Sequence, residues 1–389
     1  MTGRGVAAVL LFALLLLAGF ATGVSEIFAA AFMAGFLLAF ALASALAGAF
    51  ALRVKQSVSS AALVRGGIAE GRAVLEGLFV LPAAVRCVWA SPAGGRLVYA
   101  ALRWGKRPST VSCPLLCPHR GAWEAGIVRL TCGDVFGLFC LPVPASRRPA
   151  PLAPLLVYPE LYAIPGQPPL PPASMEYSEK NTRTADQGDS FSDTRLYRSG
   201  DPLKRIHWKL SIRTGELHTR QYEMSLDQRA LILLDDSVCG GEDPEAALGY
   251  ADMAAECAAA LAYYYLSHRQ GVLLLSAGER VDAAGPDDFD ELYTALAGMA
   301  FDAQQPAAVW LPQALADLRA VCACYVITRR PSDDVLDCLK GVPAPRRPAV
   351  LVCPSAADIP KEGEALEQGL RILPVSAPRD ILARLGGVQ

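Results

Sequence analysis

The sequence predicts a multidomain protein with three structured parts: a transmembrane helical hairpin over residues 1–55, a small β-sandwich-like domain over residues 56–165, and a doubly wound α/β domain over residues 225–389. Two apolar runs, then short strand-like runs, then alternating strands and helices predict this order. Residues 166–224 join the last two parts as a linker with a basic segment. The chain has 389 residues, 52% of them hydrophobic, so it is too long for one ordinary domain and more apolar than a soluble protein usually is.

The N-terminal hairpin is predicted from residues 6–24 and 27–52, which are almost free of charge. Each run reaches the roughly 20 residues that cross a bilayer core, and the first exceeds the roughly 7–15 apolar residues of a signal peptide. Arg4 precedes the first run, and Arg53 and Lys55 follow the second. Because positive charge stays on the cytoplasmic side, we expect a two-pass protein of the inner (cytoplasmic) membrane with its soluble domains in the cytoplasm.

The cysteines agree with a reducing compartment. Eleven is an odd number, and their irregular spacing is not typical of a disulfide framework. The cluster Cys113, Cys117 and His119 is interpreted as small buried or strand-end residues. A zinc site is the alternative interpretation, and it would need a fourth ligand.

The β-sandwich-like domain is predicted from short apolar runs separated by glycine and proline, at residues 73–81, 84–90, 95–104, 126–132 and 136–143. Such runs, without a long amphipathic helix, favour short strands. Two proline-rich stretches and a polar loop at residues 176–194 then lead out of this domain.

Residues 197–223 combine helix signals with a local excess of positive charge. Asp201 and Pro202 predict a helix start, with a carboxylate at the N-cap and proline at the first helical position, and Gly215 predicts the helix end. Residues 216–223 then fit a strand. Three apolar residues at helical spacing predict a buried face: Leu203, Ile206 and Leu210.

The basic charge of this segment is local. Between Arg195 and Arg220 seven Lys or Arg residues stand against two acids, in a chain whose net charge is -2. The pattern predicts a solvated helix that pairs with carboxylates of a neighbouring domain, and the alternative is a docking surface for an acidic partner. His207 and Trp208 are interpreted as packing residues at a domain junction.

Residues 225–389 alternate between strand and helix patterns. Strands are predicted at residues 230–234, 271–275, 321–327 and 349–353, and helices at residues 244–268, 289–299, 311–318, 332–339 and 378–385. This alternation predicts a parallel sheet covered by helices on both faces.

The basic segment resembles the signature of the bacterial and archaeal proteins that carry the domain of unknown function 58. The matching residues are Tyr197, Gly200, Asp201, Arg205, Ile206, Trp208, Lys209, Ser211, Arg213, Thr214, Gly215, Leu217, Tyr222 and Glu223, with Ile212 in place of the usual alanine. The end of the β domain resembles the same family at Arg120, Gly121, Asp134, Val135, Phe136, Gly137, Leu138, Phe139, Val157, Tyr158 and Pro159. The signature residues that are candidates for binding a partner are Tyr197, Gly200, Asp201, Arg205, Trp208, Lys209, Arg213, Gly215 and Glu223.

The resemblance also implies a von Willebrand factor A-like α/β domain, whose first strand ends in a metal-binding D-x-S-x-S loop. Here Asp235 and Ser237 match, but Cys239 lacks the hydroxyl that Mg²⁺ prefers. The loop is therefore interpreted as a strand-terminating turn, and a degenerate Mg²⁺ site on Asp235, Ser237 and Asp236 is the alternative. Further oxygen donors that the sequence does not place are Asp282, Asp287 and Asp288.

The sequence holds no phosphate-binding loop, no paired metal-binding cysteines and no nucleophile elbow. We therefore expect a non-enzymatic, membrane-anchored interaction protein without a cofactor. The resemblance adds a partner, because such proteins are commonly encoded beside MoxR-type AAA+ ATPases, and this implies a role in assembly of membrane or cell-envelope complexes.

Two alternatives belong to other function classes. One is a metal-dependent hydrolase that uses the Asp235 loop with His207 or His218. The other is nucleic-acid binding through the basic helix, which the slightly acidic net charge of the whole chain disfavours.

Overall fold

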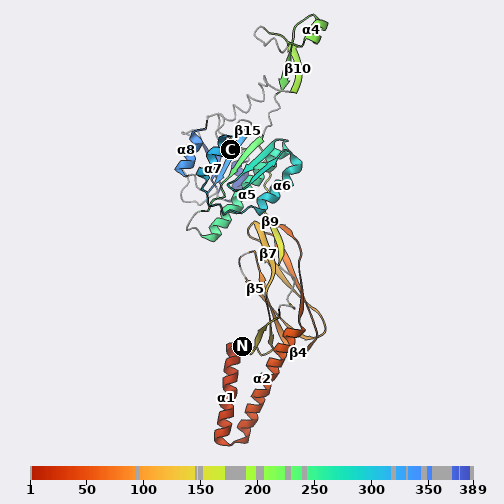
Figure 1. The fold of residues 1–389 in the computed structure, drawn as a ribbon, viewed down its shortest axis with the longest axis vertical. Helices are drawn as coiled ribbons and strands as arrows, with labels where there is room; N and C mark the ends of the chain where they lie inside the picture. The colour runs from red at the N-terminus through yellow and green to blue at the C-terminus, as the bar shows by residue number, and fades with distance from the viewer. Residues whose placement is uncertain are drawn as a thin grey trace. The chain divides into compact units, whose positions relative to one another are not determined.

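Figure 1 shows the computed structural model, which describes residues 2–92, 94, 96–144, 147, 152–170, 190–198, 206–223, 229–238, 243–316, 321–329, 332–342, 348–352, 370–375 and 377–385. The chain divides into two compact units, Met1–Tyr158 and Pro159–Gln389. Each unit has its own hydrophobic core.

The first unit begins with two antiparallel apolar helices, α1 (Gly3–Thr22) and α2 (Ser25–Ala51). Gly23 joins them in a left-handed conformation (φ 69°), which glycine adopts without steric cost. Small residues line their contact, because Gly19 lies against the Phe28 ring and Gly35 against the Phe12 ring. Both helices are long and apolar enough to cross a membrane, and little of either is buried.

A β domain of two sheets follows α2. One sheet has the order β1-β3-β6, with β1 Arg53–Val58, β3 Ile68–Glu76 and β6 Ser109–Leu116. The other has the order β2-β9-β7-β4-β5, with β8 on β7; its strands are β2 Ala62–Val64, β4 Phe79–Ala90, β5 Arg96–Gly105, β7 Gly121–Asp134, β8 Cys140–Pro142 and β9 Ala153–Tyr158. β2 pairs with β9 in parallel and the other described pairs are antiparallel, so this second sheet is mixed.

The two sheets enclose one core around the fully buried Trp89. A Cβ atom at Gly71 of β3 would come within 2.6 Å of the Trp89 ring, so glycine is what lets this strand cover the indole. Burial raises the pKa of Cys87 to about 11 and that of Cys132 to about 12. Both cysteines therefore stay protonated at neutral pH and act as small apolar packing residues.

The β domain has strands that the sequence did not predict, β1, β2, β6 and β9, and the predicted run 136–143 holds only the short strand β8. A further difference lies at one turn. Residues 73–81 were expected to form one strand, but β3 ends at Glu76 and β4 begins at Phe79. Gly77 turns the chain there (φ 141°), and a Cβ at this position would come 2.3 Å from the Ala51 carbonyl oxygen. The end of the preceding helix therefore decides where the strand breaks.

The second unit holds a small element that we call the signature hairpin, residues 190–198 and 206–223. Strand β10 (Ser190–Leu196) pairs with β11 (His218–Glu223) in antiparallel orientation, and helix α4 (Trp208–Thr214) lies between them in sequence. The predicted helix end at Gly215 and the predicted strand that follows it are confirmed.

The rest of the second unit is built on a sheet of the order β14-β13-β12-β15-β16-β17. Neighbouring strands are parallel except β14, which is antiparallel to β13 at one edge. The strands are β12 Arg229–Leu234, β13 Gly271–Leu275, β14 Arg280–Ala283, β15 Val321–Thr328, β16 Ala349–Val352 and β17 Arg371–Pro374. The helices are α5 Pro244–Ser267, α6 Phe289–Gly298, α7 Ala307–Ala316, α8 Asp333–Lys340 and α10 Pro378–Leu385.

Both faces of this sheet are covered by helices. In β12, Ala230, Ile232 and Leu234 share one core with residues of α5, α6 and α10, whereas Leu231 and Leu233 share a second core with residues of α7 and α8. Every strand and helix predicted in this region has a counterpart, while β14 and β17 were not predicted. Because β12 is buried on both faces, polar residues appear only where it ends.

Two tryptophans give opposite predictions for stability. Trp89 is fully buried, so Trp89→Ala should lower the free energy of unfolding of the β domain by about 3–5 kcal/mol through the cavity that it leaves. Trp208 is 57% exposed, so its interpretation as a packing residue is wrong, and Trp208→Ala should change stability by no more than about 0.5 kcal/mol. Thermal denaturation of the full chain in detergent measures both, and a large loss from Trp208→Ala would contradict the exposed placement.

Candidate functional site

Helix α4 of the signature hairpin is held by local hydrogen bonds. The Nδ1 atom of His207 accepts from the Leu210 N–H (3.1 Å), so His207 is the N-cap. Gly215 ends the helix in a left-handed conformation (φ 79°), and its N–H donates to the Ser211 carbonyl (2.9 Å). Ser211 Oγ accepts from the His218 N–H (2.8 Å), which ties the helix to β11.

This helix is shorter than the sequence predicts. Ile206 forms a β-bridge with Thr219, and the His207 N–H donates to the His218 carbonyl (2.7 Å), so the helix begins only at Trp208. A β-branched residue opposite a strand favours extended backbone, which helical spacing alone does not reveal. The predicted start at Asp201 and Pro202 lies outside the described residues.

Helix α4 presents apolar side chains to solvent. Trp208 is 57% exposed and Ile212 is 82% exposed, and the two lie one helical turn apart on the same face. Lys209 and Arg213 are also exposed and form the adjacent row with the same spacing. We call these four residues the α4 surface. An exposed aromatic and aliphatic pair bordered by basic side chains has the composition of a binding surface.

The remaining signature residues have different positions. Tyr197 is half-buried, and its N–H donates to the Leu217 carbonyl (2.8 Å) next to β11. Glu223 occupies the last position of β11, opposite Ser190. Gly200 and Arg205 lie outside the described residues. The hairpin thus brings Tyr197, Trp208, Lys209, Arg213 and Gly215 into one element.

A second candidate region lies where β12 and β15 end. Asp235 Oδ1 accepts hydrogen bonds from Ser237 Oγ (2.6 Å) and from the Ser237 N–H (3.2 Å). Asp235 Oδ2 accepts from Thr328 Oγ1 (2.8 Å). The Tyr250 hydroxyl donates to the Asp235 carbonyl, and the Arg329 guanidinium lies 4.3 Å from the centre of the Tyr250 ring. Both carboxylate oxygens are therefore hydrogen-bonded, Oδ1 within the turn and Oδ2 to the end of β15.

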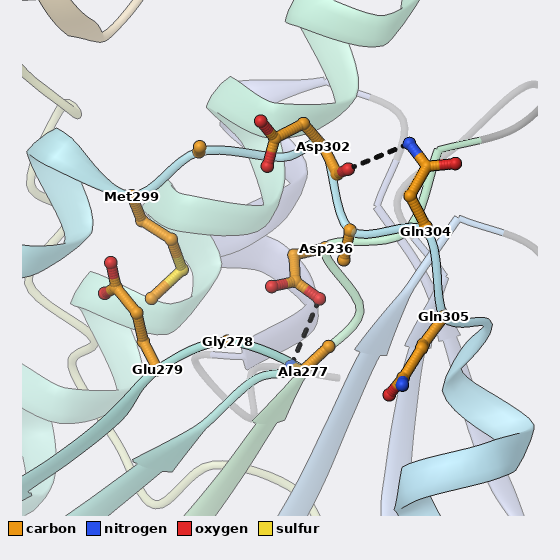
Figure 2. A pocket seen from close by; sticks show the side chains of 10 residues that line it. Asp236, Ala277, Gly278, Glu279, Met299, Asp302, Gln304 and Gln305 are labelled. Carbon is orange, nitrogen blue, oxygen red and sulfur yellow. Dashed lines mark hydrogen bonds between the residues drawn. The ribbon is translucent and has the colours of Figure 1, made fainter.

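A pocket of about 380 Å³ opens beside this turn and is shown in Figure 2. It is lined by Asp236, Ala277, Gly278, Glu279, Met299, Ala300, Asp302, Ala303, Gln304 and Gln305. Asp236 is only 4% exposed, and its Oδ1 accepts from the Ala277 N–H (3.2 Å). The Ala303 N–H donates to the Asp236 carbonyl (3.1 Å), which brings the loop after α6 against the end of β12.

The pocket gathers acids that the sequence does not group. Figure 2 shows Glu279 and Asp302 on different loops, with Asp236 between them. Asp236 was a candidate because it follows a buried strand, whereas Glu279 and Asp302 carry no motif. Asp282 and Asp288, considered as oxygen donors for this turn, have other partners: Asp282 pairs with Arg229, and Asp288 accepts from the N–H groups of Ala284 and Gly285. Three carboxylates give the pocket an electrostatic preference for a basic group.

Residues 193–321 match a family model described as "Protein of unknown function DUF58". The chain carries a DUF58 region. This region extends from within β10 to the start of β15, so it contains most of the signature hairpin, all of β12 and the pocket. Among solved structures, the CARDB domain of a Pyrococcus furiosus protein in complex with di-metal ions is similar at a TM-score of 0.20 and 12% identity, over 27% of this chain and 86% of that one. No curated protein matches the sequence.

In the DUF58 region the hydroxyls of Ser237 and Thr328 both donate to the Asp235 carboxylate, so its two oxygens already have partners in this structure. The guanidinium of Arg329, against the Tyr250 ring, adds a fixed positive charge near the turn. Cys239 lies outside the described residues.

The described part of the chain also groups no three His, Cys, Asp or Glu residues that could hold a metal ion. Cys113 and Cys117 are buried, and their thiols donate to the carbonyls of Pro114 (4.0 Å) and Leu115 (3.6 Å). These contacts, with His119 also buried, are those of packing residues.

Thr328→Val tests the role of the turn, because it removes a buried hydroxyl and keeps the side-chain shape. Asp235 Oδ2 then loses its hydrogen bond, so the free energy of unfolding of the second unit should fall by about 1–3 kcal/mol. Thr110→Val, at an exposed position of β6, is the matched control and should change stability by no more than about 0.5 kcal/mol. Thermal denaturation of the full chain measures both.

The same measurement tests the metal. If the turn is structural and binds no ion, millimolar Mg²⁺ should leave the Tm of the parent protein unchanged. An ion that binds the native state would instead raise the Tm by mass action. A rise in Tm that Asp235→Ala abolishes would contradict the assignment of the turn to structure.

Proposed function

We propose that this chain is a membrane-anchored, non-enzymatic interaction protein, in which α1 and α2 hold it in the membrane and the α4 surface binds a partner protein. The observation that carries the proposal is the exposed pair Trp208 and Ile212 beside Lys209 and Arg213. Tryptophan and arginine contribute most to binding energy at protein interfaces. Burial against a partner also removes the apolar pair from water, which is favourable.

The partner that fits the α4 surface has an acidic groove with an apolar floor, because such a groove complements both the basic row and the apolar row. The resemblance to DUF58 proteins supports a MoxR-type AAA+ ATPase as this partner. The chain then acts in assembly of membrane or cell-envelope complexes.

We also propose that the α/β domain is doubly wound and von Willebrand factor A-like. The sheet order supports this, because the chain leaves β12 toward β13 on one side and later returns to β15 on its other side. In such sheets ligands meet the carboxyl ends of the strands where the order reverses. The pocket beside Asp236 has this location.

A non-enzymatic role is supported by how the candidate catalytic groups are used. The Nδ1 atom of His207 caps α4, and both oxygens of Asp235 accept hydrogen bonds from Ser237 and Thr328. A hydrolytic site needs a base whose lone pair faces a substrate or a metal-bound water. His207 and Asp235 use these atoms for hydrogen bonds within the fold instead.

Nucleic-acid binding is a second candidate function that one observation favours. An exposed aromatic side chain beside basic residues is what single-stranded nucleic acids require, and Trp208 has Lys209 as its neighbour. Binding of a fluorescent single-stranded oligonucleotide by the full chain, with affinity that falls steeply as salt rises, would favour this function over the protein partner.

The topology prediction uses a reporter fused after Gln389. Arg4, Arg53 and Lys55 should keep both flanks of the hairpin in the cytoplasm, so a cytosolic reporter should be active and a periplasm-dependent reporter silent. The same pair of reporters inserted at Gly23, between α1 and α2, should give the reverse result. Periplasmic activity of the C-terminal fusion would overturn the orientation.

The partner prediction uses the double variant Trp208→Ala/Ile212→Ala. Loss of two exposed anchors should lower co-purification of the MoxR-type ATPase of the same organism with the full chain by about tenfold or more, since roughly 1.4 kcal/mol corresponds to tenfold in affinity. Val309→Ala, at an exposed position of α7, is the matched control. Equal recovery of the ATPase with the double variant would refute the α4 surface as its binding site.

A further inference from the structure

The β domain contacts both α1 and α2, and these contacts lie at one level along the two helices. The turn between β7 and β8 contacts the start of α1, because the Thr2 hydroxyl and N–H donate to the carbonyls of Gly137 (2.7 Å) and Leu138 (3.2 Å). The same turn packs on α2, where Phe139 forms a cluster with Ala41 and Ala45. The β7–β8 turn therefore lies beside the first turn of α1 and beside Ala41 and Ala45 of α2.

From that level onward one face of α2 is covered by protein. The Ser44 hydroxyl donates to the Pro82 carbonyl, and Gly48 packs directly on Ala83 and Cys132. Helix α1 has 20 residues and so spans about 30 Å, the thickness of a bilayer hydrocarbon core. If α1 fills that core, the bilayer surface passes through its first residues and through the β7–β8 turn.

Large apolar side chains of the β domain project from this end and are exposed. Trp104, at the end of β5, is 74% exposed, and Val80 and Phe136 are also exposed. The strand register places them together, since Phe79 is opposite Gly105, and Ala83 is opposite both Arg103 and Asp134. We call the exposed apolar residues of this end the rim: Leu78, Val80, Leu102, Trp104, Val135 and Phe136.

The exposed charges beside the rim are basic. Lys106 and Arg107 follow Trp104 in the β5–β6 turn, and Arg4 lies in the first turn of α1. The buried Arg103 fixes this turn, because it donates to the Arg107 carbonyl and lies over the Phe79 ring. The two acids in these segments have other partners. Glu76 pairs with Lys55 (2.9 Å), and Asp134 is buried and accepts from the N–H groups of Leu138 and Phe139.

We propose that the rim and its basic border seat the β domain in the headgroup layer of an anionic bilayer. This rests on the proposed membrane anchorage of α1 and α2. Trp104 and Phe136 lie at the depth where aromatic side chains prefer the membrane interface, and Lys106 and Arg107 bind anionic headgroups. The lipid surface is the occupant that the structure favours, because the rim is continuous with the exposed faces of the two apolar helices. The domain is thereby fixed against the membrane instead of tethered above it.

Tryptophan fluorescence tests this seating. The full chain is reconstituted into vesicles that contain phosphatidylglycerol brominated near the glycerol backbone, whose bromine quenches indoles in the interface. The parent should be quenched, and Trp104→Phe should lose that quenching. Trp208→Phe removes another exposed tryptophan and should leave the quenched fraction unreduced. Quenching that is the same in Trp104→Phe and in the parent would overturn the proposal.

The charge of the lipid is tested by a second arm. Lys106→Glu/Arg107→Glu should reduce the quenching of Trp104 in anionic vesicles, whereas brominated phosphatidylcholine should quench the parent less than brominated phosphatidylglycerol does. Equal quenching by both lipids would overturn the anionic preference.

Flotation of the vesicles separates this proposal from the anchorage: a chain that floats with vesicles but shows no quenching of Trp104 refutes the seating alone, and a chain that does not float refutes the anchorage.

Discussion

The first unit depends on the packing of α2 against the β domain. Small residues make that packing close, since a Cβ atom at Gly48 would lie 2.6 Å from the Cys132 sulfur and 2.7 Å from the Ala83 Cβ. Any larger residue would push the helix off the sheet. Strand β1 begins at Arg53, directly after the Leu52 cap of α2, so no flexible linker separates helix from sheet. The packing of the core therefore fixes the position of the β domain relative to α1 and α2.

A corresponding constraint in the second unit comes from β12. This strand is buried on both faces, and the two residues that follow it make hydrogen bonds to the segments on either side. Asp235 does so toward β15 through Thr328, and Asp236 does so toward the loop after β13 through the Ala277 N–H. The pocket is the space that remains between the loops that these bonds hold.

Much of the α/β part can be predicted from the sequence, because buried parallel strands are continuous apolar runs and the helices between them have regularly spaced apolar residues. The limits of β12, β13 and α5 follow from residues such as Pro244 and Gly271. The candidate sites are harder, because their members come from separate loops. Asp236 follows a strand and is found, whereas Glu279 and Asp302 approach it only through the fold.

Two other misses have a different physical origin. Ile206 fits a helical repeat, yet its pairing with Thr219 is a contact between segments that periodicity does not encode. Residues 41–49 of α2 are as apolar as the rest of the helix, although the β domain covers many of them. Hydropathy measures the preference of a side chain for leaving water, and burial in lipid and burial in protein satisfy that preference equally. The part of α2 that the β domain covers is therefore revealed by contacts, not by composition.

Under the two proposals, the two exposed tryptophans of the described residues have different partners despite their similar chemistry. Trp104 has Lys106 and Arg107 nearby, and Trp208 has Lys209 and Arg213, so each combines an indole with two cations. Trp104 stands on a β domain whose level is set by its contacts with α1 and α2, and its apolar neighbours come from β5, from the start of β4 and from the turn after β7. Such a broad rim suits a fluid surface that accepts side chains at any lateral position. Trp208 instead shares one short helix with Ile212 at a spacing of one turn, which presents a narrow ridge of fixed geometry. A ridge of that kind gains most from a groove of complementary shape, as only a folded partner provides.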